Sequence, residues 1–208
     1  MYVKISLKFL SVASITFFMT IALIEPINAS GVTEGLKATI NGVISIAKDE
    51  KYKNDKKARR AAIRRIIDLK FSYRQMSIRS LAKNWNQRTA KEQKEFVILF
   101  GKLLENSYAS KIEAYSNEVI TYVDEVIKGK YALVKTKIIR VDGTIEVDYK
   151  LIRENGDWRI FDFVIEGVSM VKNYRSQFSR IIKKESFEAL KKKMASKIEG
   201  IEEAGLES

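Results

Sequence analysis

The sequence predicts an α+β fold in which helices pack on the concave face of a curved, four-stranded antiparallel sheet. Apolar residues recur at helical intervals of three and four residues from Leu36 to Ile112. From Val119 the interval changes to two, with short turn sequences between the runs. Helical spacing returns after Gly167. Helices before and after an antiparallel meander are typical of a single α+β domain.

The first residues have the pattern of a secretory signal peptide. Lys4 and Lys8 precede an uncharged apolar run from Phe9 to Ile24, and the small residue Ala29 follows. We expect cleavage after Ala29, which makes residues 1–29 a signal peptide and places the protein in the periplasm. The alternative is an uncleaved anchor helix, but hydroxyl side chains dilute the apolar run.

The composition limits the chemistry of the remaining chain. Its 208 residues include no Cys and no His, which excludes disulfides, thiol nucleophiles, Cys or His metal sites and a Ser-His-Asp triad. We therefore expect no enzyme, no metal and a single domain over residues 30–200, with a flexible tail at 201–208. The formal net charge of +12 favours transient contact with anionic membrane surfaces or acidic partners. Nucleic acid is not expected as a partner, because the cations are spread over the chain.

The first predicted helix runs from Thr33 to Ala47. A charged segment, Lys48 to Lys57, follows and is interpreted as a solvated loop or a frayed helix end. The second helix buries Ala62, Ile63, Ile66 and Ile67.

Two more helical segments precede the strands. The segment from Phe71 to Trp85 has Met76 and Leu81 among its apolar anchors. Thr89 and Glu92 have capping-box spacing, so a helix should begin at Thr89. Its apolar stripe comprises Phe96, Phe100, Leu103, Leu104, Tyr108 and Ile112. Core packing is the alternative to a ligand-binding wall for each residue of this stripe.

Four strands are expected, at Thr121–Ile127, Tyr131–Val141, Thr144–Arg153 and Asp157–Glu166. Asp142-Gly143 and Asn155-Gly156 are strong hairpin turns, because these residues tolerate positive φ. In the third strand, alternation places Ile145, Val147, Tyr149 and Leu151 on one face.

The fourth strand leads into a strand–helix corner at Glu166-Gly167. Ser169 is the expected N-cap of a helix from Met170 to Ile182. A last helix has an apolar face formed by Phe187, Leu190, Met194 and Ile198. Because apolar residues lie on both sides of Gly167, we interpret the corner as the mouth of an apolar pocket.

The corner also carries a family resemblance. The run from Trp158 to Phe178, WRIFDFVIEGVSMVKNYRSQF, closely resembles the signature of the MlaC-type phospholipid carriers, also called toluene-tolerance auxiliary proteins. The upstream segment from Phe71 to Phe96 matches that family in the same order. The resemblance covers Leu36 to Lys197. This chain departs from the family at Ala82, where Gly is common, and in lacking several prolines.

The resemblance implies a nuclear-transport-factor-2-like cone with extra N-terminal and C-terminal helices. It implies a monomeric periplasmic protein that shuttles phospholipid between the two membranes and maintains outer-membrane lipid asymmetry. The implied partners are an inner-membrane ABC transporter with a ring-forming substrate-binding subunit and an outer-membrane lipoprotein–porin complex. Phospholipid would be the bound cargo, with no cofactor.

The candidate lipid-binding residues come from the helical stripe, the third and fourth strands and the corner. They are Phe71, Met76, Phe96, Phe100, Leu103, Leu104, Tyr108, Val147, Tyr149, Leu151, Phe161, Phe163, Val168, Ser169 and Val171. For Val168 and Val171, packing under the following helix is the alternative. The corner assignment predicts that Val168→Glu abolishes lipid co-purification.

Two other functions remain open from the sequence. An isomerase or dehydratase in the same cone could use Asp162 with Tyr149 if both faced the cavity, although Asp162 falls on the opposite strand face from Phe161 and Phe163. An ion pair with Arg159 or Arg175 is the simpler interpretation of Asp162. A non-lipid adaptor of a transporter is the third hypothesis, favoured by a narrow, closed cavity.

Overall fold

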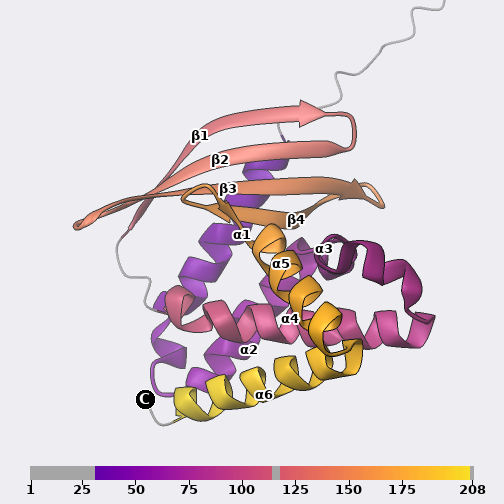
Figure 1. Cartoon of the computed structure of the whole chain (residues 1–208). Helices are drawn as coiled ribbons and strands as arrows, with labels where there is room; N and C mark the ends of the chain where they lie inside the picture. The colour runs from indigo at the N-terminus through magenta and orange to yellow at the C-terminus, as the bar shows by residue number, and fades with distance from the viewer. Residues whose placement is uncertain (1–30, 114–117, 207–208) are drawn as a thin grey trace, which may run out of the picture.

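A curved antiparallel sheet lies over a layer of helices in the computed structural model, which describes residues 31–113 and 118–206 (Figure 1). The predicted signal peptide lies outside these residues. The helices are α1 (Gly31–Lys48), α2 (Lys56–Lys70), α3 (Tyr73–Leu81), α4 (Ala90–Glu113), α5 (Met170–Lys184) and α6 (Phe187–Leu206), with short 3₁₀ segments at Glu50–Tyr52 and Ala82–Gln87. The strands are β1 (Val119–Lys128), β2 (Tyr131–Arg140), β3 (Gly143–Glu154), β4 (Asp157–Ile165) and β5 (Val168–Ser169). This architecture confirms the α+β prediction.

The sheet is a meander in the order β1-β2-β3-β4-β5, one strand more than the four predicted. Glu166 (φ 48°) and Gly167 (φ 75°) turn the chain back on β4. The extra strand is short, since it pairs with β4 over only two residues. Val168 then pairs with Ile165, and Ser169 pairs with Val164. Two residues carry no alternation pattern, so sequence periodicity could not reveal β5.

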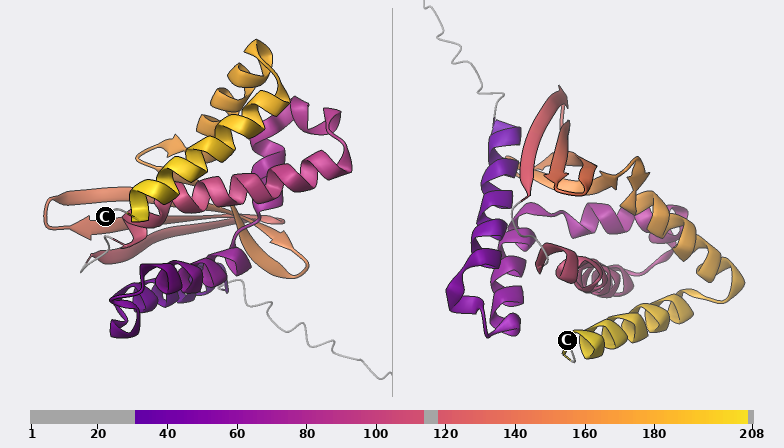
Figure 2. Two further views of the ribbon diagram at one scale, coloured as in Figure 1. Left: turned by 90° about the horizontal axis from the view of Figure 1, so that it is seen from below. Right: turned by 90° about the vertical axis from the view of Figure 1, so that its left-hand side faces the viewer.

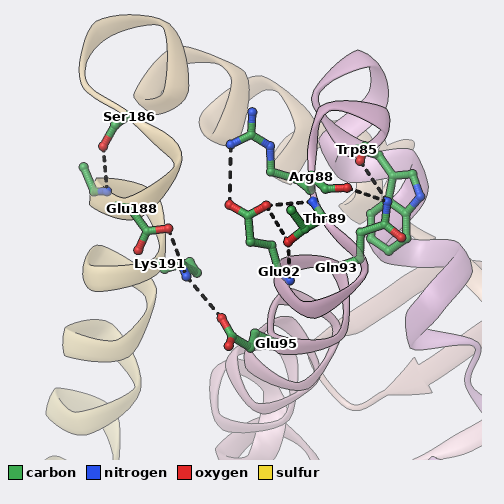
Figure 3. Close-up of polar contacts among 10 residues, drawn as sticks. Trp85, Arg88, Thr89, Glu92, Gln93, Glu95, Ser186, Glu188 and Lys191 are labelled. Carbon is green, nitrogen blue, oxygen red and sulfur yellow. Dashed lines mark hydrogen bonds and ion pairs between the residues drawn. The ribbon is translucent and has the colours of Figure 1, made fainter.

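The capping box at the start of α4 is confirmed. The Glu92 amide donates to Thr89 Oγ1 at 3.2 Å, and the Thr89 amide donates to Glu92 Oε2 at 2.7 Å (Figure 3). These reciprocal bonds satisfy two backbone donors that a helix start would otherwise leave unpaired. Further along the same interface, Lys191 of α6 contacts Glu95 of α4 at 3.3 Å. The two helices are thus joined by polar contacts at their surface.

The segment from Phe71 to Trp85 does not form one continuous helix. Helix α3 ends at Leu81, and Ala82 adopts φ 50° and ψ −123°, a conformation that L-residues rarely populate. The chain then continues as the 3₁₀ segment Ala82–Gln87. The predicted anchors Met76, Leu81 and Trp85 are all buried despite this break.

Two other predicted boundaries differ in detail. The charged segment after α1 contains a single 3₁₀ turn, and Asp55 then caps α2 by accepting from the Ala58 amide at 2.8 Å. Helix α6 continues to Leu206, six residues beyond the predicted end of the domain at residue 200. It packs along α4, and Asn106 donates to Glu202 Oε1 at 3.0 Å, so the predicted tail carries an interhelical contact.

The molecule has two separate hydrophobic cores. The larger core joins α3, α4, α5 and α6 and includes Phe96, Phe100, Phe178 and Leu190. The smaller core joins the N-terminal half of α1 to the sheet through Val32, Leu36, Val134, Leu151 and Ile160. Phe71 packs against both cores and thereby connects them. In the part of the chain that the structure describes, no helix combines the length and apolarity needed to cross a bilayer.

Candidate functional site

A cavity of about 570 Å³ lies between the two cores. The concave face of the sheet forms one wall, and α1, α2 and the C-terminal half of α4 form the others; Figure 2 shows the α1–α2 pair standing beside the sheet and α4. Most of the lining side chains are aliphatic or aromatic. They include Leu36, Ile40, Val43, Ile44, Ala47, Ile63, Ile67, Phe71, Leu104, Ile120, Ile138, Ile145, Val147, Ile160, Phe163 and Ile165.

The sheet wall consists of cross-strand rows of apolar residues. Ile138 lies opposite both Ile120 and Ile145, so three isoleucines form one row across β1, β2 and β3. Val147 lies opposite Ile165 in the next row. Side chains that oppose each other across a ladder point to the same face of the sheet. The alternation predicted for β3 therefore supplies one continuous wall.

The opposite wall depends on α1 diverging from the sheet. Val32, in its first turn, packs in the smaller core against the sheet, and Leu36, one turn later, belongs to that core and also lines the cavity. Val43, Ile44 and Ala47, in its last turns, line the cavity and lie outside that core. The same apolar stripe thus forms core at one end of the helix and cavity wall at the other.

Tyrosines supply part of the interior polarity. The Tyr108 hydroxyl donates to Met170 Sδ at 2.6 Å, and its ring packs edge-on against Phe163 with 5.2 Å between centroids. Burial raises the pKa of Tyr108 to about 12. Burial likewise raises the pKa values of Tyr73 and Tyr149. All three hydroxyls are therefore neutral at physiological pH, and they add no charge to the cavity.

Charged groups also line the cavity. They belong to α2 (Arg60, Arg64), the C-terminal half of α4 (Glu105) and the end of β2 (Arg140). Arg64 Nη1 contacts Glu105 Oε2 at 3.1 Å. Burial is the largest cause that raises the pKa of Glu105, and the Arg64 guanidinium opposes it.

Six of the residues predicted to bind lipid line this cavity: Phe71, Leu104, Tyr108, Val147, Tyr149 and Phe163. Five others are buried outside it, because they pack within the two cores: Met76, Phe96, Phe100 and Leu103 in the larger and Leu151 in the smaller. For these five the core-packing alternative describes their position.

Phe161 also lies outside the cavity, for a different reason. The register between β3 and β4 shifts at Lys150/Leu151, so Phe161 is the unpaired residue of a β-bulge. A bulge inserts one residue and redirects its side chain. Phe161 packs instead against Tyr131, with 5.9 Å between centroids, and lies under the Arg79 guanidinium at 4.2 Å.

The strand–helix corner, interpreted from the sequence as the mouth of an apolar pocket, contributes none of its residues Val168, Ser169 and Val171 to the lining of this cavity. Val168 is 53% exposed and does not line the cavity, and Val171 is buried in the larger core. Ser169 caps α5 by accepting from the Lys172 amide at 3.1 Å, which confirms its predicted structural role. The corner turns away from the cavity because β5 folds back on the outer edge of β4.

The buried side chain of Asp162 holds this corner together through three polar contacts. It accepts from Ser169 Oγ at 2.7 Å and from the Val171 amide at 3.1 Å, and it pairs with Lys150 Nζ at 3.2 Å. Its partner is thus Lys150 and neither of the arginines suggested by the sequence. Asp162 is buried and does not line the cavity, so it does not form an acid–base pair with Tyr149 there.

Sequence reasoning missed the α1 residues and the arginines of the cavity. The apolar stripe of α1 was recognised, but nothing local distinguishes a stripe that faces a sheet from one that faces a cavity. In α2 the arginines stand beside the apolar positions Ala62, Ile63, Ile66 and Ile67, a pattern typical of a solvated outer face. No group of His, Cys, Asp and Glu suited to a metal occurs among the described residues.

Comparison with known proteins identifies the family of this chain. A protein from Haemophilus influenzae, named the intermembrane phospholipid transport system binding protein MlaC, is 26% identical over 120 residues; the match spans 55% of this chain and 56% of that protein. A phospholipid-binding protein from Ralstonia solanacearum, solved in complex with a phospholipid, superposes with a TM-score of 0.73 at 17% identity. That alignment covers 81% of this chain and 97% of the other. Residues 37–196 match the family described as MlaC protein, and the chain therefore belongs to that family.

Proposed function

We propose that this protein is a phospholipid carrier that holds acyl chains in the cavity between its two cores. The observation that carries the proposal is the size and apolar lining of the cavity. Membership of the MlaC family supports it, as does the similarity to a phospholipid transport protein of Haemophilus influenzae and a phospholipid-binding protein of Ralstonia solanacearum.

The capacity of the cavity fits acyl chains. A dry apolar cavity of about 150 Å³ accommodates one benzene molecule. By that ratio a cavity of about 570 Å³ accommodates roughly two dozen carbons. This is enough for one long acyl chain and part of a second, with the remainder at the mouth.

The energetics also suit a carrier. Each buried methylene gains about 0.8 kcal/mol relative to water, so roughly two dozen carbons gain on the order of 19 kcal/mol. Relative to a bilayer the gain is close to zero, because the bilayer also keeps the chains dry. A lipid held in such a cavity is thus protected from water yet remains transferable to a membrane.

The route of the lipid follows from the family and the predicted signal peptide. We propose that the protein works in the periplasm, between an inner-membrane ABC transporter with a ring-forming substrate-binding subunit and an outer-membrane lipoprotein–porin complex. Its task there is to maintain outer-membrane lipid asymmetry. The formal net charge of +12 supports transient contact with anionic surfaces.

Native mass spectrometry of protein purified without detergent tests the proposal. We expect a bound mass equal to that of a two-chain phospholipid. Wild-type protein that carries no lipid, and that takes up none from vesicles, would refute it and favour the adaptor hypothesis. Turnover of a small-molecule substrate in the cavity would favour the enzyme hypothesis, which the position of Asp162 outside the cavity makes unattractive.

A further inference from the structure

The charged side chains that line the cavity come from neighbouring ends of several elements. Arg60 and Arg64 belong to α2 and Glu105 to the C-terminal half of α4, and Arg140 is the last residue of β2. In Figure 1 the C-terminal end of α4, the β2–β3 hairpin and the α1–α2 turn all lie on the left-hand side of the molecule. The right panel of Figure 2 looks onto that side. The charged part of the lining thus comes from elements whose ends share one side of the molecule.

The cations at this end are all arginines. Lysine outnumbers arginine by 26 to 12 in the chain, yet each cationic residue that lines the cavity in the described structure is an arginine: Arg60, Arg64 and Arg140. A guanidinium presents a planar fork of donors that matches the oxygens of a phosphate or carboxylate, whereas an ammonium acts as a point charge. The residue type therefore points to an oxyanion ligand.

Arg64 and Arg140 are held in place by carboxylates and are still accessible. Arg64 Nε lies 3.4 Å from Asp68 Oδ2, its Nη1 lies 3.1 Å from Glu105 Oε2, and its side chain is 42% exposed. Arg140 Nε lies 3.5 Å from Glu118 Oε1, and its side chain is 38% exposed. Each guanidinium has five N–H donors, so the two carboxylate contacts of Arg64 and the one of Arg140 orient these groups without using all of their donors.

Arg60 and Arg64 act from the same wall. They are four residues apart on α2, which places them on one face a single turn apart. Arg140 approaches from the sheet wall, since it lies at the end of the strand that carries Ile138. Because phosphorus is tetrahedral, a phosphodiester bound between these walls can direct one oxygen toward the arginines of α2 and another toward Arg140.

We propose that Arg60, Arg64 and Arg140 bind the phosphodiester of the lipid where its acyl chains enter the cavity. This inference rests on the proposed carrier function and adds that the protein recognises the phosphate as well as the chains. Phosphate recognition lets the carrier discriminate phospholipids from neutral lipids with identical chains, which an apolar cavity alone cannot do.

The test compares two ligands with the same fluorescently labelled acyl chains, phosphatidylglycerol and diacylglycerol. A hydrogen bond to a charged group typically changes affinity by about tenfold or more, so we expect wild-type protein to bind phosphatidylglycerol at least about tenfold more tightly. In the triple variant Arg60→Gln, Arg64→Gln, Arg140→Gln this preference should fall to about threefold or less. Its affinity for diacylglycerol should stay unchanged, which also reports that the cavity is intact.

A matched control removes three exposed arginines that do not line the cavity, through Arg65→Gln, Arg153→Gln and Arg180→Gln. It carries the same change in net charge and should keep the wild-type preference. Loss of the preference in this control would overturn the proposal in favour of general charge attraction.

The remaining outcomes separate this proposal from the carrier function. Equal binding of the two lipids by wild-type protein would overturn phosphate recognition and leave the carrier function intact. Binding of neither lipid would refute both. Inorganic phosphate should compete poorly with phosphatidylglycerol, because it lacks the acyl chains. If inorganic phosphate instead saturates the arginines at a lower concentration than phosphatidylglycerol does, the arginines form a free-phosphate site and the lipid assignment is overturned.

Discussion

A carboxylate placed in the cavity wall should block lipid binding in a pH-dependent manner. Ile165 of β4 has two cross-strand neighbours, Val147 on β3 and Val168 on β5. Val147 is 6% exposed and lines the cavity, whereas Val168 is 53% exposed and does not. The substitutions Val147→Glu and Val168→Glu therefore introduce the same charge on either side of one residue, but only the first places it against the acyl chains.

The size of the effect follows from the cost of neutralising the carboxylate. When chains fill the cavity, the carboxylate loses its water and binding requires that it take up a proton. With an ordinary glutamate pKa of about 4.3 and 1.36 kcal/mol per pH unit, protonation costs about 3.7 kcal/mol at pH 7, about 500-fold in affinity. At pH 5.3 the same step costs about 1.4 kcal/mol, or about tenfold. Binding should thus recover as the pH falls.

Dissociation constants for a fluorescent phospholipid at the two pH values test this reasoning, with far-UV circular dichroism to verify the fold. The Val168→Glu variant should bind the phospholipid as tightly as the wild-type protein at both pH values. Val147→Gln separates charge from polarity, because its cost of about 1–3 kcal/mol should not depend on pH. A loss for Val147→Glu that is identical at pH 7 and pH 5.3, or equal losses for Val147→Glu and Val168→Glu, would refute the cavity assignment.

Three further predictions concern stability and the corner. Ala82→Gly should raise Tm, because it relieves a positive-φ backbone conformation that costs on the order of 1–3 kcal/mol for a residue with a Cβ; differential scanning calorimetry measures the shift, and a lower Tm would contradict the assigned conformation. Asp162→Asn should destabilise the fold by about 2 kcal/mol in denaturant titrations, through weaker bonds at the corner, while phospholipid affinity stays unchanged; a change in affinity would link Asp162 to the cavity. Burial raises the folded-state pKa of Glu105, so the folded state binds its proton more tightly and the stability contributed by this group falls as pH rises through that pKa. Glu105→Gln should remove this part of the pH dependence of the unfolding free energy. A profile of unfolding free energy against pH that the substitution leaves unaltered would argue against a raised pKa for Glu105.

Features with a local cause could be predicted from the sequence. The Asn155-Gly156 turn, with φ values of 51° and 91°, and the Thr89 capping box depend on residues next to each other in the chain, and both occur as expected. Strand boundaries followed from such turns to within about two residues. The family's usual glycine at position 82 also has a structural reason, because Ala82 adopts a glycine-like conformation.

Features with a tertiary cause could not be predicted. An apolar side chain looks the same in sequence whether it packs in a core, as Phe100 does, or lines a cavity, as Ile44 does. The bulge that redirects Phe161 is a property of the pairing between two strands and leaves no mark on either. The corner shows the same limit, because Val171 packs in the larger core whereas Val168, three residues earlier, is exposed.

The division of the interior into two cores gives the cargo a structural role. Only Phe71 packs against both cores among the described core residues, and the cavity occupies the space between them. Bound acyl chains would therefore act as a third, replaceable core that joins α1 and α2 to the rest of the domain. Loading then strengthens the fold by mass action, and unloading weakens it. A receiving complex that holds α1 and α2 apart from the sheet would favour the unloaded state, and delivery could proceed without hydrolysis of a nucleotide by the carrier itself.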